Sequence, residues 1–216
     1  MSAPAKRKND PEGLKKRILA SALSAFAEFG LQGARMEQIA ENARTTKRMV
    51  VYHFSNKEQL YSEVLHHVYR EIRLHETDLN LAEMPPSQAI ARLAEASFDY
   101  HVTHPDFMRL ICSENLMRGR YIRESATIIR LNQSALAVLD SVLQRGKERG
   151  EFDPQVTTVD VHRLISSISF HNVANHYTFN ALFGAEESEQ QSLSRTRKLV
   201  VDATLRYLRP PDKSVQ

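Results

Sequence analysis

The chain has 216 residues, 42% of them hydrophobic, and a formal net charge of +3. This length allows a buried core in one domain or in two smaller ones. A single cysteine, Cys112, excludes an internal disulfide and favours a reducing compartment. Because no apolar run approaches the roughly 20 residues that span a bilayer, we expect a cytoplasmic protein without a membrane segment.

Positive charge is concentrated in the N-terminal quarter of the chain. Residues 1–60 contain 11 Lys and Arg against 6 Asp and Glu, whereas residues 61–216 contain 18 against 20. This asymmetry favours a polyanion-binding head on a nearly neutral body, although basic faces are also common on solvated surfaces. Residues 1–11 lack the apolar stretch of a signal peptide and are predicted to form a disordered basic arm.

Helical spacing dominates the N-terminal region, and strand-like alternation is nearly absent, so the predicted fold is all-α. The first helix is expected to end at Gly30, where a helix C-terminus favours a left-handed residue. A short helix over Met36–Ala43 follows, and a longer one begins near Asn56, capped by Ser55 or Asn56. The first helix is indicated by apolar residues at three- and four-residue steps: Leu14, Ile18, Ala22, Ala25, Phe26 and Phe29.

Beyond Pro85 and Pro86 the pattern predicts a body of longer helices, ended by Pro210 and Pro211. The predicted domains are a helix-turn-helix domain over 12–72, an effector-binding and dimerisation domain over 73–209, and a flexible tail over 210–216. The expected helices are Ser87–Thr103, Phe107–Arg118 as one helix or a pair, Ile122–Gly146, Val159–Phe183 and Ser188–Leu208.

The segment Arg44–Leu60 is rich in hydroxyl-bearing, cationic and aromatic residues. A short helix, a tight turn and a second short helix define the helix-turn-helix motif, whose second helix enters the DNA major groove. Met36–Ala43 is the predicted supporting helix and Thr46–His53 the predicted recognition helix. Val50 and Phe54, four residues apart, are then expected to face inward.

The polar residues of this motif have chemistry suited to DNA. Lys47 and Arg48 lie in the first turn of the predicted recognition helix, where a cation can pair with O6 and N7 of guanine. Thr45 or Thr46 is expected to cap that helix and to turn its hydroxyl toward a phosphate. A solvated basic surface is the alternative interpretation. The remaining expected phosphate contacts are Arg35, Tyr52, His53 and Lys57.

Residues 25–65 resemble the N-terminal DNA-binding domain of the tetracycline-repressor (TetR) family. The resemblance is carried by Phe29-Gly30, by the I-A-x-x-A pattern of Ile39–Ala43, by Tyr52–Phe54 and by the run from Lys57 to Leu60. It implies a homodimeric, ligand-responsive transcriptional regulator, usually a repressor. The implied architecture is a three-helix DNA-binding head on a larger helical bundle, with double-stranded operator DNA and a small-molecule effector as partners.

The chain departs from the family pattern in the turn, at Arg48, at Val51, where an aromatic residue is common, and at Ser55, where a proline is common. The turn commonly reads Gly-Val-Ser, whereas this chain has Arg44-Thr45-Thr46. Without the glycine, Arg44 is expected to adopt a left-handed conformation at some cost. Arg48 stands where relatives commonly carry a small residue. This indicates that the chain has a base preference different from that of its relatives. Residues 150–179 are similar in layout to the pyrimidine-utilisation repressor group, but we do not extend a pyrimidine ligand to this chain.

Two sets of residues in the body are candidate binding positions. The middle helices, with the polar part of Val159–Phe183, supply candidate effector contacts, and ordinary core packing or a polar dimer seam are the alternatives. The last helix has two apolar faces, which indicates one for the core and one for a second copy of the chain. The effector candidates are Phe98, His101, Phe107, Met108, Ile111, Cys112, His171 and Asn175, and the dimer candidates are His176, Val200, Ala203, Thr204 and Tyr207.

Other classes of protein find less support in the sequence. A Gly-rich phosphate loop, H-E-x-x-H, G-x-S-x-G and paired-cysteine motifs are absent, so neither an enzyme nor a cofactor is expected. The histidines lack the spacing of zinc ligands, and no residue near Cys112 in sequence favours a thiol sensor. A DNA-binding activator and an architectural protein without a ligand are the alternatives to a repressor, and the long helical body disfavours the architectural one.

Overall fold

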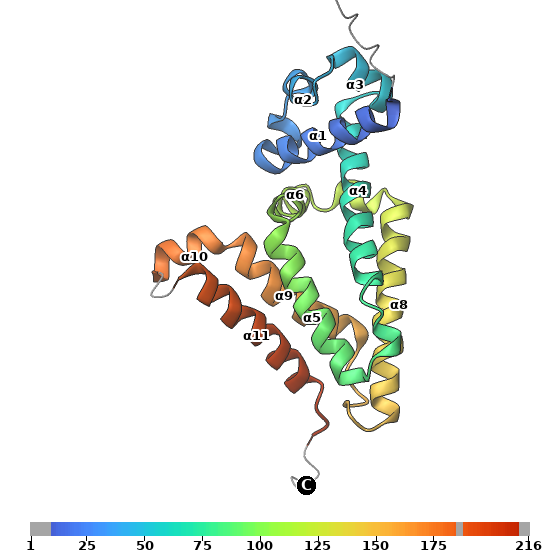
Figure 1. Ribbon diagram of the computed structural model, residues 1–216, viewed down its shortest axis with the longest axis vertical. Helices are drawn as coiled ribbons and strands as arrows, with labels where there is room; N and C mark the ends of the chain where they lie inside the picture. Colours follow the sequence, from blue (N-terminus) through green and yellow to red (C-terminus); the bar gives the residue numbers. More distant parts are fainter. Residues whose placement is uncertain (1–9, 185–187, 212–216) are drawn as a thin grey trace, which may run out of the picture. The chain divides into compact units, whose positions relative to one another are not determined.

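The computed structural model describes residues 10–184 and 188–211. Within these ranges the chain forms α-helices and one short 3-10 helix and no strand, which confirms the predicted all-α fold (Figure 1). The predicted arm and tail lie for the most part outside the described residues. No helix in the described ranges is long and apolar enough to cross a membrane. The chain divides into two compact units after His67, and each is described by itself.

The first unit contains the helices of the predicted DNA-binding head: α1 (Pro11–Gly33), α2 (Met36–Asn42), α3 (Lys47–Phe54) and the beginning of α4 (Lys57–Thr77). Its core includes Ile18, Phe26 and Tyr61, all fully buried, and the rings of Phe26 and Tyr61 meet edge to face with centroids 5.1 Å apart. Gly30 has φ 64 and interrupts the helical backbone of α1, as expected for the predicted helix end.

Side-chain caps fix the starts of three helices in this unit. Oδ1 of Asp10 accepts from the backbone N–H of Gly13, and Oγ1 of Thr46 accepts from that of Met49 at the start of α3. Of the two residues expected to cap α4, it is Asn56 that does so, since its Oδ1 accepts from the N–H of Gln59 at 2.7 Å. Ser55 instead ends α3, with φ 61.

The turn between α2 and α3 is closed by a paired hydrogen-bond motif at the helix end. The N–H of Thr45 donates to the carbonyl of Ala40, and the N–H of Arg44 donates to that of Glu41, both at 2.9 Å. This arrangement requires a left-handed residue at position 44, and Arg44 has φ 56. The strained conformation expected from the missing glycine is therefore confirmed.

Replacing Arg44 measures the strain of this turn. Arg44→Gly and Arg44→Ala both remove the exposed cation, but only glycine adopts positive φ without a Cβ clash. We expect the glycine variant to be about 1 kcal/mol more stable than the alanine variant. Chemical denaturation followed by circular dichroism measures the difference, and equal midpoints for the two variants would contradict it.

The second unit begins within α4 and continues through η1 (Leu81–Glu83) and the helices of the body. These helices are α5 (Pro86–Thr103), α6 (Pro105–Leu116), α7 (Arg120–Arg123), α8 (Ala126–Glu148), α9 (Thr158–Ala174), α10 (His176–Phe183) and α11 (Glu189–Tyr207).

Two of the predicted body helices are interrupted. The segment expected as one helix over Val159–Phe183 breaks at Asn175, whose φ −106 and ψ 7 separate α9 from α10. The helix expected to start at Ile122 starts instead at Ala126, because Ser125 caps it and the short α7 precedes it. Both breaks lie in stretches without Pro or Gly, the residues that usually signal them in a sequence.

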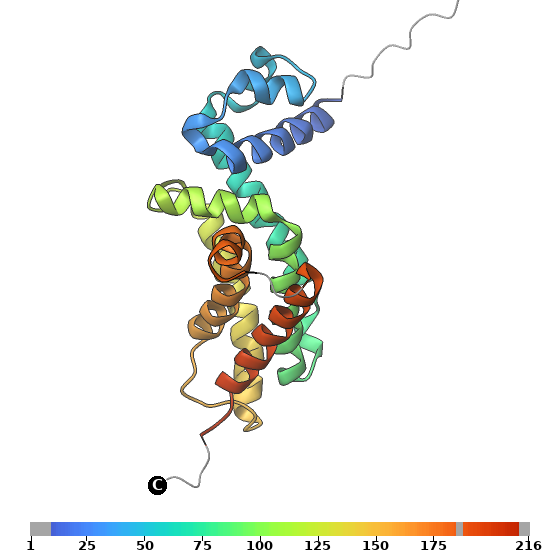
Figure 2. The same cartoon turned by 90° about the vertical axis from the view of Figure 1, so that its left-hand side faces the viewer.

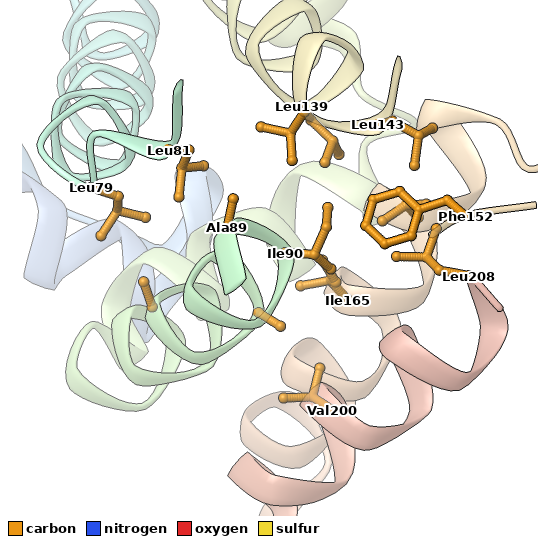
Figure 3. Close-up of a cluster of buried hydrophobic side chains, with 14 of the residues drawn as sticks. Leu79, Leu81, Ala89, Ile90, Leu139, Leu143, Phe152, Ile165, Val200 and Leu208 are labelled. Atoms are coloured by element: carbon orange, nitrogen blue, oxygen red, sulfur yellow. The ribbon is translucent and has the colours of Figure 1, made fainter. Parts of the chain in front are cut away.

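Helices α5, α8, α9 and α11 enclose the core of the second unit, and α11 packs along α5 and α9 (Figure 2). Figure 3 shows Leu139 and Leu143 of α8 close to Ile90 of α5, with Phe152 and Leu208 at one end of the cluster. Outside this core, the guanidinium of Arg197 on α11 reaches α5, where its Nε donates to Asp99 at 2.9 Å and Nη1 lies 3.1 Å from Glu95. The last helix is thereby fixed to the body by both apolar and charged contacts.

Candidate DNA-binding surface and effector cavity

The eight residues of α3 divide between an inward and an outward face. Val50 and Phe54 are fully buried in the first unit, as predicted, beside the buried Ile39 of α2. Lys47 and Arg48 are exposed, and so is Tyr52, whose exposed fraction is 78%. A solvent-facing helix with cations in its first turn and an aromatic hydroxyl in its second has the groups that contact base edges and phosphates.

Lys47 is held by an acidic neighbour on that surface. Its Nζ lies 2.7 Å from Oε1 of Glu37 on α2, and both side chains are exposed. The hydrogen bond from Lys47 lowers the pKa of the Glu37 carboxyl. An exposed pair of this kind is weak, so Lys47 can exchange Glu37 for another acceptor at little cost.

The other predicted DNA contacts surround α3. Arg35 is exposed and precedes α2, and Thr45 lies half-buried in the turn. His53 is half-buried, with its ring edge to face against that of Tyr52 at 5.2 Å. Lys57 differs from these, because its Nζ donates to the carbonyls of Gln32 and Ala34, each at 3.2 Å. Lys57 therefore also ties α4 to the end of α1.

The second unit contains a cavity of about 900 Å³ between the C-terminal part of α4 and helices α5, α6, α8 and α9. Much of its wall is apolar, and this size is typical of sites for drug-sized ligands. Three apolar side chains of the wall, Leu74, Val138 and Val159, remain about half exposed, so the cavity is open to solvent.

Half of the predicted effector residues line this cavity. His101, Phe107, Met108 and Ile111 do so, whereas Phe98 packs inside the core cluster. The lining does not include Cys112, His171 or Asn175. Burial raises the pKa of the Cys112 thiol, which disfavours the reactive thiolate.

Several polar lining residues lie in the predicted effector-binding domain but were not among the effector candidates. Arg73 and Glu76 belong to α4, which had been assigned for the most part to the head, and Asn132 belongs to α8. With Tyr69, the α4 residues follow three- and four-residue steps along one helix face. That spacing was visible in the sequence, but nothing there showed that this face borders a cavity.

The buried polar groups of the cavity are only partly hydrogen-bonded. Nη1 of Arg73 lies 2.8 Å from Oε2 of Glu76, and the two side chains are 12% and 18% exposed. Neither Nε of Arg73 nor Nδ1 of His101 has a hydrogen-bond partner among the described residues. Burial, followed by the charge of Arg73, lowers the pKa of His101 to about 4, so this imidazole is neutral at pH 7. Burial likewise raises the pKa of the Glu76 carboxyl.

The described residues contain no cluster of three or more His, Cys, Asp or Glu side chains that would suit a metal ion.

Comparisons with known proteins agree with this architecture in both units. Residues 18–64 match the model for bacterial regulatory proteins of the tetR family, and residues 86–204 match that of the tetracyclin repressor-like C-terminal domain. The chain belongs to the TetR family of bacterial transcriptional regulators. It is a DNA-binding regulator with a helix-turn-helix head and a helical ligand-binding domain, as the sequence predicted.

Its curated relatives are named as transcriptional regulators. The repressor NicS of Pseudomonas putida is 29% identical over 203 residues, which is 94% of this chain and 96% of NicS. The repressor SCO4008 of Streptomyces coelicolor is 32% identical and covers 74% of this chain and 78% of its own. RutR of Escherichia coli, 33% identical over 56% of this chain and 57% of its own, confirms the predicted similarity to the pyrimidine-utilisation group.

Solved structures show the same fold. The transcriptional regulator SCO4942 of Streptomyces coelicolor superimposes with a TM-score of 0.66 at 28% identity, covering 92% of this chain and 99% of its own. The ketosteroid transcriptional regulator KstR2 of Mycobacterium tuberculosis gives a TM-score of 0.65 at 21% identity, covering 91% and 96%.

In this TetR-family body, the last two helices carry exposed apolar side chains, which we call together the α10–α11 surface. Two of the predicted dimer residues, Val200 and Thr204, do not belong to it, because both are fully buried within their own subunit. His176 and Ala203 are half-buried, and Tyr207 is 46% exposed. The exposed apolar side chains of the surface are Tyr177, Phe179, Leu182, Phe183, Leu199 and Tyr207.

The burial of His101 predicts a loss of stability in acid. The folded protein disfavours the protonated imidazole, with a pKa of about 4 against 6.5 for the free group, so the unfolded chain binds more protons between these values. Stability should therefore fall as pH drops from about 6.5 to 4, and one pKa unit corresponds to roughly 1.4 kcal/mol, or about 3 kcal/mol over this window.

The test is urea denaturation of wild type and His101→Gln across that pH range. The variant lacks the titrating group and should lose less stability toward pH 4. Parallel pH profiles for the two proteins would show that His101 is not held neutral by the fold.

Proposed function

We propose that this chain is a homodimeric cytoplasmic repressor that binds a palindromic operator through α3 and is released when a small molecule occupies the cavity of the second unit. The observation that carries this proposal is the division of α3 into a buried face and an exposed cationic face, within a chain that belongs to the TetR family. A two-fold symmetric protein reads a palindromic site, with one recognition helix in each half-site.

Base recognition is assigned to the first turn of α3. Lys47 and Arg48 are the exposed cations there, and they follow the Thr46 cap. Arg48 carries the greater weight in this assignment, because Lys47 already has Glu37 as a partner at 2.7 Å. The helix N-terminus and the hydroxyls of Thr45 and Thr46 are suited to a phosphate, as are Arg35, Tyr52, His53 and Lys57.

Arg35 and Arg48 form a matched pair of exposed arginines for testing these roles. If Arg48 reads a base, Arg48→Ala should weaken operator binding by about 1–3 kcal/mol and leave binding to a scrambled duplex nearly unchanged. If Arg35 contacts a phosphate, Arg35→Ala should weaken both complexes alike and lower the slope of log K against log salt by about one unit.

The measurement is a fluorescence-anisotropy titration at several salt concentrations, on an operator selected from random duplexes by the wild-type protein. Lys57 is a poorer phosphate probe than Arg35, because its bonds to Gln32 and Ala34 mix stability with DNA contact. Failure of the wild-type protein to enrich any palindrome would refute operator binding. Equal weakening of both duplexes by Arg48→Ala would refute only the base-reading role.

The homodimer is assigned to the α10–α11 surface. Leu182 is 76% exposed on α10 and Leu199 is 54% exposed on α11, and apolar side chains gathered in this way on a soluble protein mark an interaction surface. The second copy is the expected occupant, because symmetric self-association is the commonest state of soluble oligomers and accompanies palindromic operators.

Charges on this surface should therefore dissociate the dimer. Leu182→Glu and Leu199→Glu bury a carboxylate in the proposed interface, which should weaken dimerisation at least about 100-fold. Leu116→Glu on α6, where the side chain is 87% exposed, is the matched control outside the surface. Sedimentation velocity at micromolar concentration should show monomers for the first two variants and a dimer for the control. A dimer in all three would place the interface elsewhere.

The effector role is assigned to the cavity because it is large and open, and because some polar groups in its lining residues have no hydrogen-bond partner within residues 10–184 and 188–211. A ligand that lowers operator affinity must bind more weakly to the DNA-bound protein by the same factor. An activator would show the opposite sign of this coupling, and an architectural protein would show none.

A further inference from the structure

The cavity contains a cation that is almost removed from water. The side chain of Arg73 is 12% exposed, and its Nη1 pairs with Glu76 at 2.8 Å. Its Nε is buried and has no hydrogen-bond partner among the described residues. A buried guanidinium donor without an acceptor costs free energy that a ligand oxygen can recover.

A second unpartnered group lies in the same cavity wall. His101 on α5 is 8% exposed, and its Nδ1 has no hydrogen-bond partner among the described residues. His101 and Arg73 line the same cavity, and the charge of Arg73 contributes to the lowered pKa of His101. Arg73 and His101 thus come from different helices and both line the cavity, and each has one buried nitrogen without a hydrogen-bond partner among the described residues.

The charges of the lining favour a negative ligand. The ionised side chains in the cavity wall are the guanidinium groups of Arg70, Arg73 and Arg163 and the carboxylate of Glu76, and Nη1 of Arg163 is paired at 3.1 Å with Asp160 outside the wall. The wall thus carries an excess of positive charge. A neutral carbonyl could accept one hydrogen bond but would leave that charge uncompensated, whereas a carboxylate supplies both the acceptor oxygens and the opposite charge.

The rest of the wall suits an apolar body. Phe107 and Met108 of α6 are nearly buried, and Phe107 stacks edge to face on Tyr69 with ring centroids 5.8 Å apart. Leu139 and Ile165 contribute from α8 and α9. Such a wall stabilises a ligand in proportion to the apolar area that it removes from water.

We propose that the cavity binds an amphipathic organic anion whose carboxylate accepts hydrogen bonds from Nε of Arg73 and Nδ1 of His101 while its apolar body packs on Phe107 and Met108. This inference rests on the proposed function in naming the chemical class of the effector. Glu76 competes with such a ligand, because it pairs with the guanidinium of Arg73 at 2.8 Å and repels an incoming carboxylate.

Because Arg73 attracts the proposed carboxylate and Glu76 repels it, substitutions of the two residues should change anion binding in opposite directions. The probes are benzoate, benzamide and benzyl alcohol, which share a ring and differ in charge, and 2-naphthoate, which enlarges the apolar body. Binding to the full-length protein without DNA is followed in the millimolar range by the ¹⁵N shift of the His101 ring, assigned by its loss in His101→Gln.

Wild type should bind benzoate at least about tenfold more tightly than benzamide or benzyl alcohol, as expected for a charge-assisted hydrogen bond, and 2-naphthoate more tightly still. Arg73→Gln should abolish the preference for benzoate. Glu76→Gln should strengthen benzoate binding several-fold, because it frees the guanidinium. A merely structural defect would weaken binding in both variants.

Arg92→Gln is the control, since Arg92 is an exposed arginine of α5 outside the cavity lining and should leave the preference in place. If Arg73→Gln misfolds, Arg73→Gln/Glu76→Gln removes both charges together and should likewise lose the preference. Three results would overturn the inference: benzamide binding as tightly as benzoate, Glu76→Gln weakening benzoate, or no benzoate binding in the millimolar range.

The operator titration in the presence of 2-naphthoate separates this inference from the proposed function. Anion binding that leaves operator affinity unchanged would refute the effector role and uphold the ligand class. Operator release by benzamide or benzyl alcohol bound in the same cavity would uphold the effector role and refute the ligand class.

Discussion

The 3.6-residue period of the α-helix is the constraint on which the rest of this structure depends. Each helix has to bury one stripe in its own unit, and only the remaining faces are open to DNA, a ligand or another copy. In α3 the stripe is Val50 and Phe54, so Lys47 and Arg48 face solvent. In α11 Val200, Thr204 and Leu208 are buried, and Leu199 and Tyr207 stay outside. Residues one position apart thus have unrelated roles.

That periodicity explains which features could be predicted from the sequence. The inward face of α3, the Thr46 cap, the interruption of α1 at Gly30 and the left-handed Arg44 all depend on residues within four positions of one another. Local hydrogen bonding and Cβ sterics determine such features, and both can be inferred from the residue types. The helix-turn-helix could therefore be inferred almost residue by residue, although its DNA contacts stay predictions.

The features that depend on packing between distant segments could not be predicted in this way. The last helix was seen to have two apolar faces, but only the packing of α11 along α5 and α9 shows which face is internal. For the same reason, nothing in the sequence distinguished Phe98, in the core cluster, from Phe107, in the cavity wall. Arg73 was missed because a charged residue on a long helix is usually solvated, and its burial comes from helices far along the chain.

The cavity shows how a helical body can keep a buried cation without a ligand. Arg73 would be strongly destabilising if it were alone, and the pair with Glu76 offsets part of that cost. The offset is incomplete, since Nε has no hydrogen-bond partner in the described part of the chain and burial raises the pKa of Glu76. A carboxylate whose pKa is raised is more easily protonated when a second anion approaches, so the site can exchange an internal counter-ion for an external one. In the proposed site, the same two residues therefore pair with one another and provide the preference for an anion.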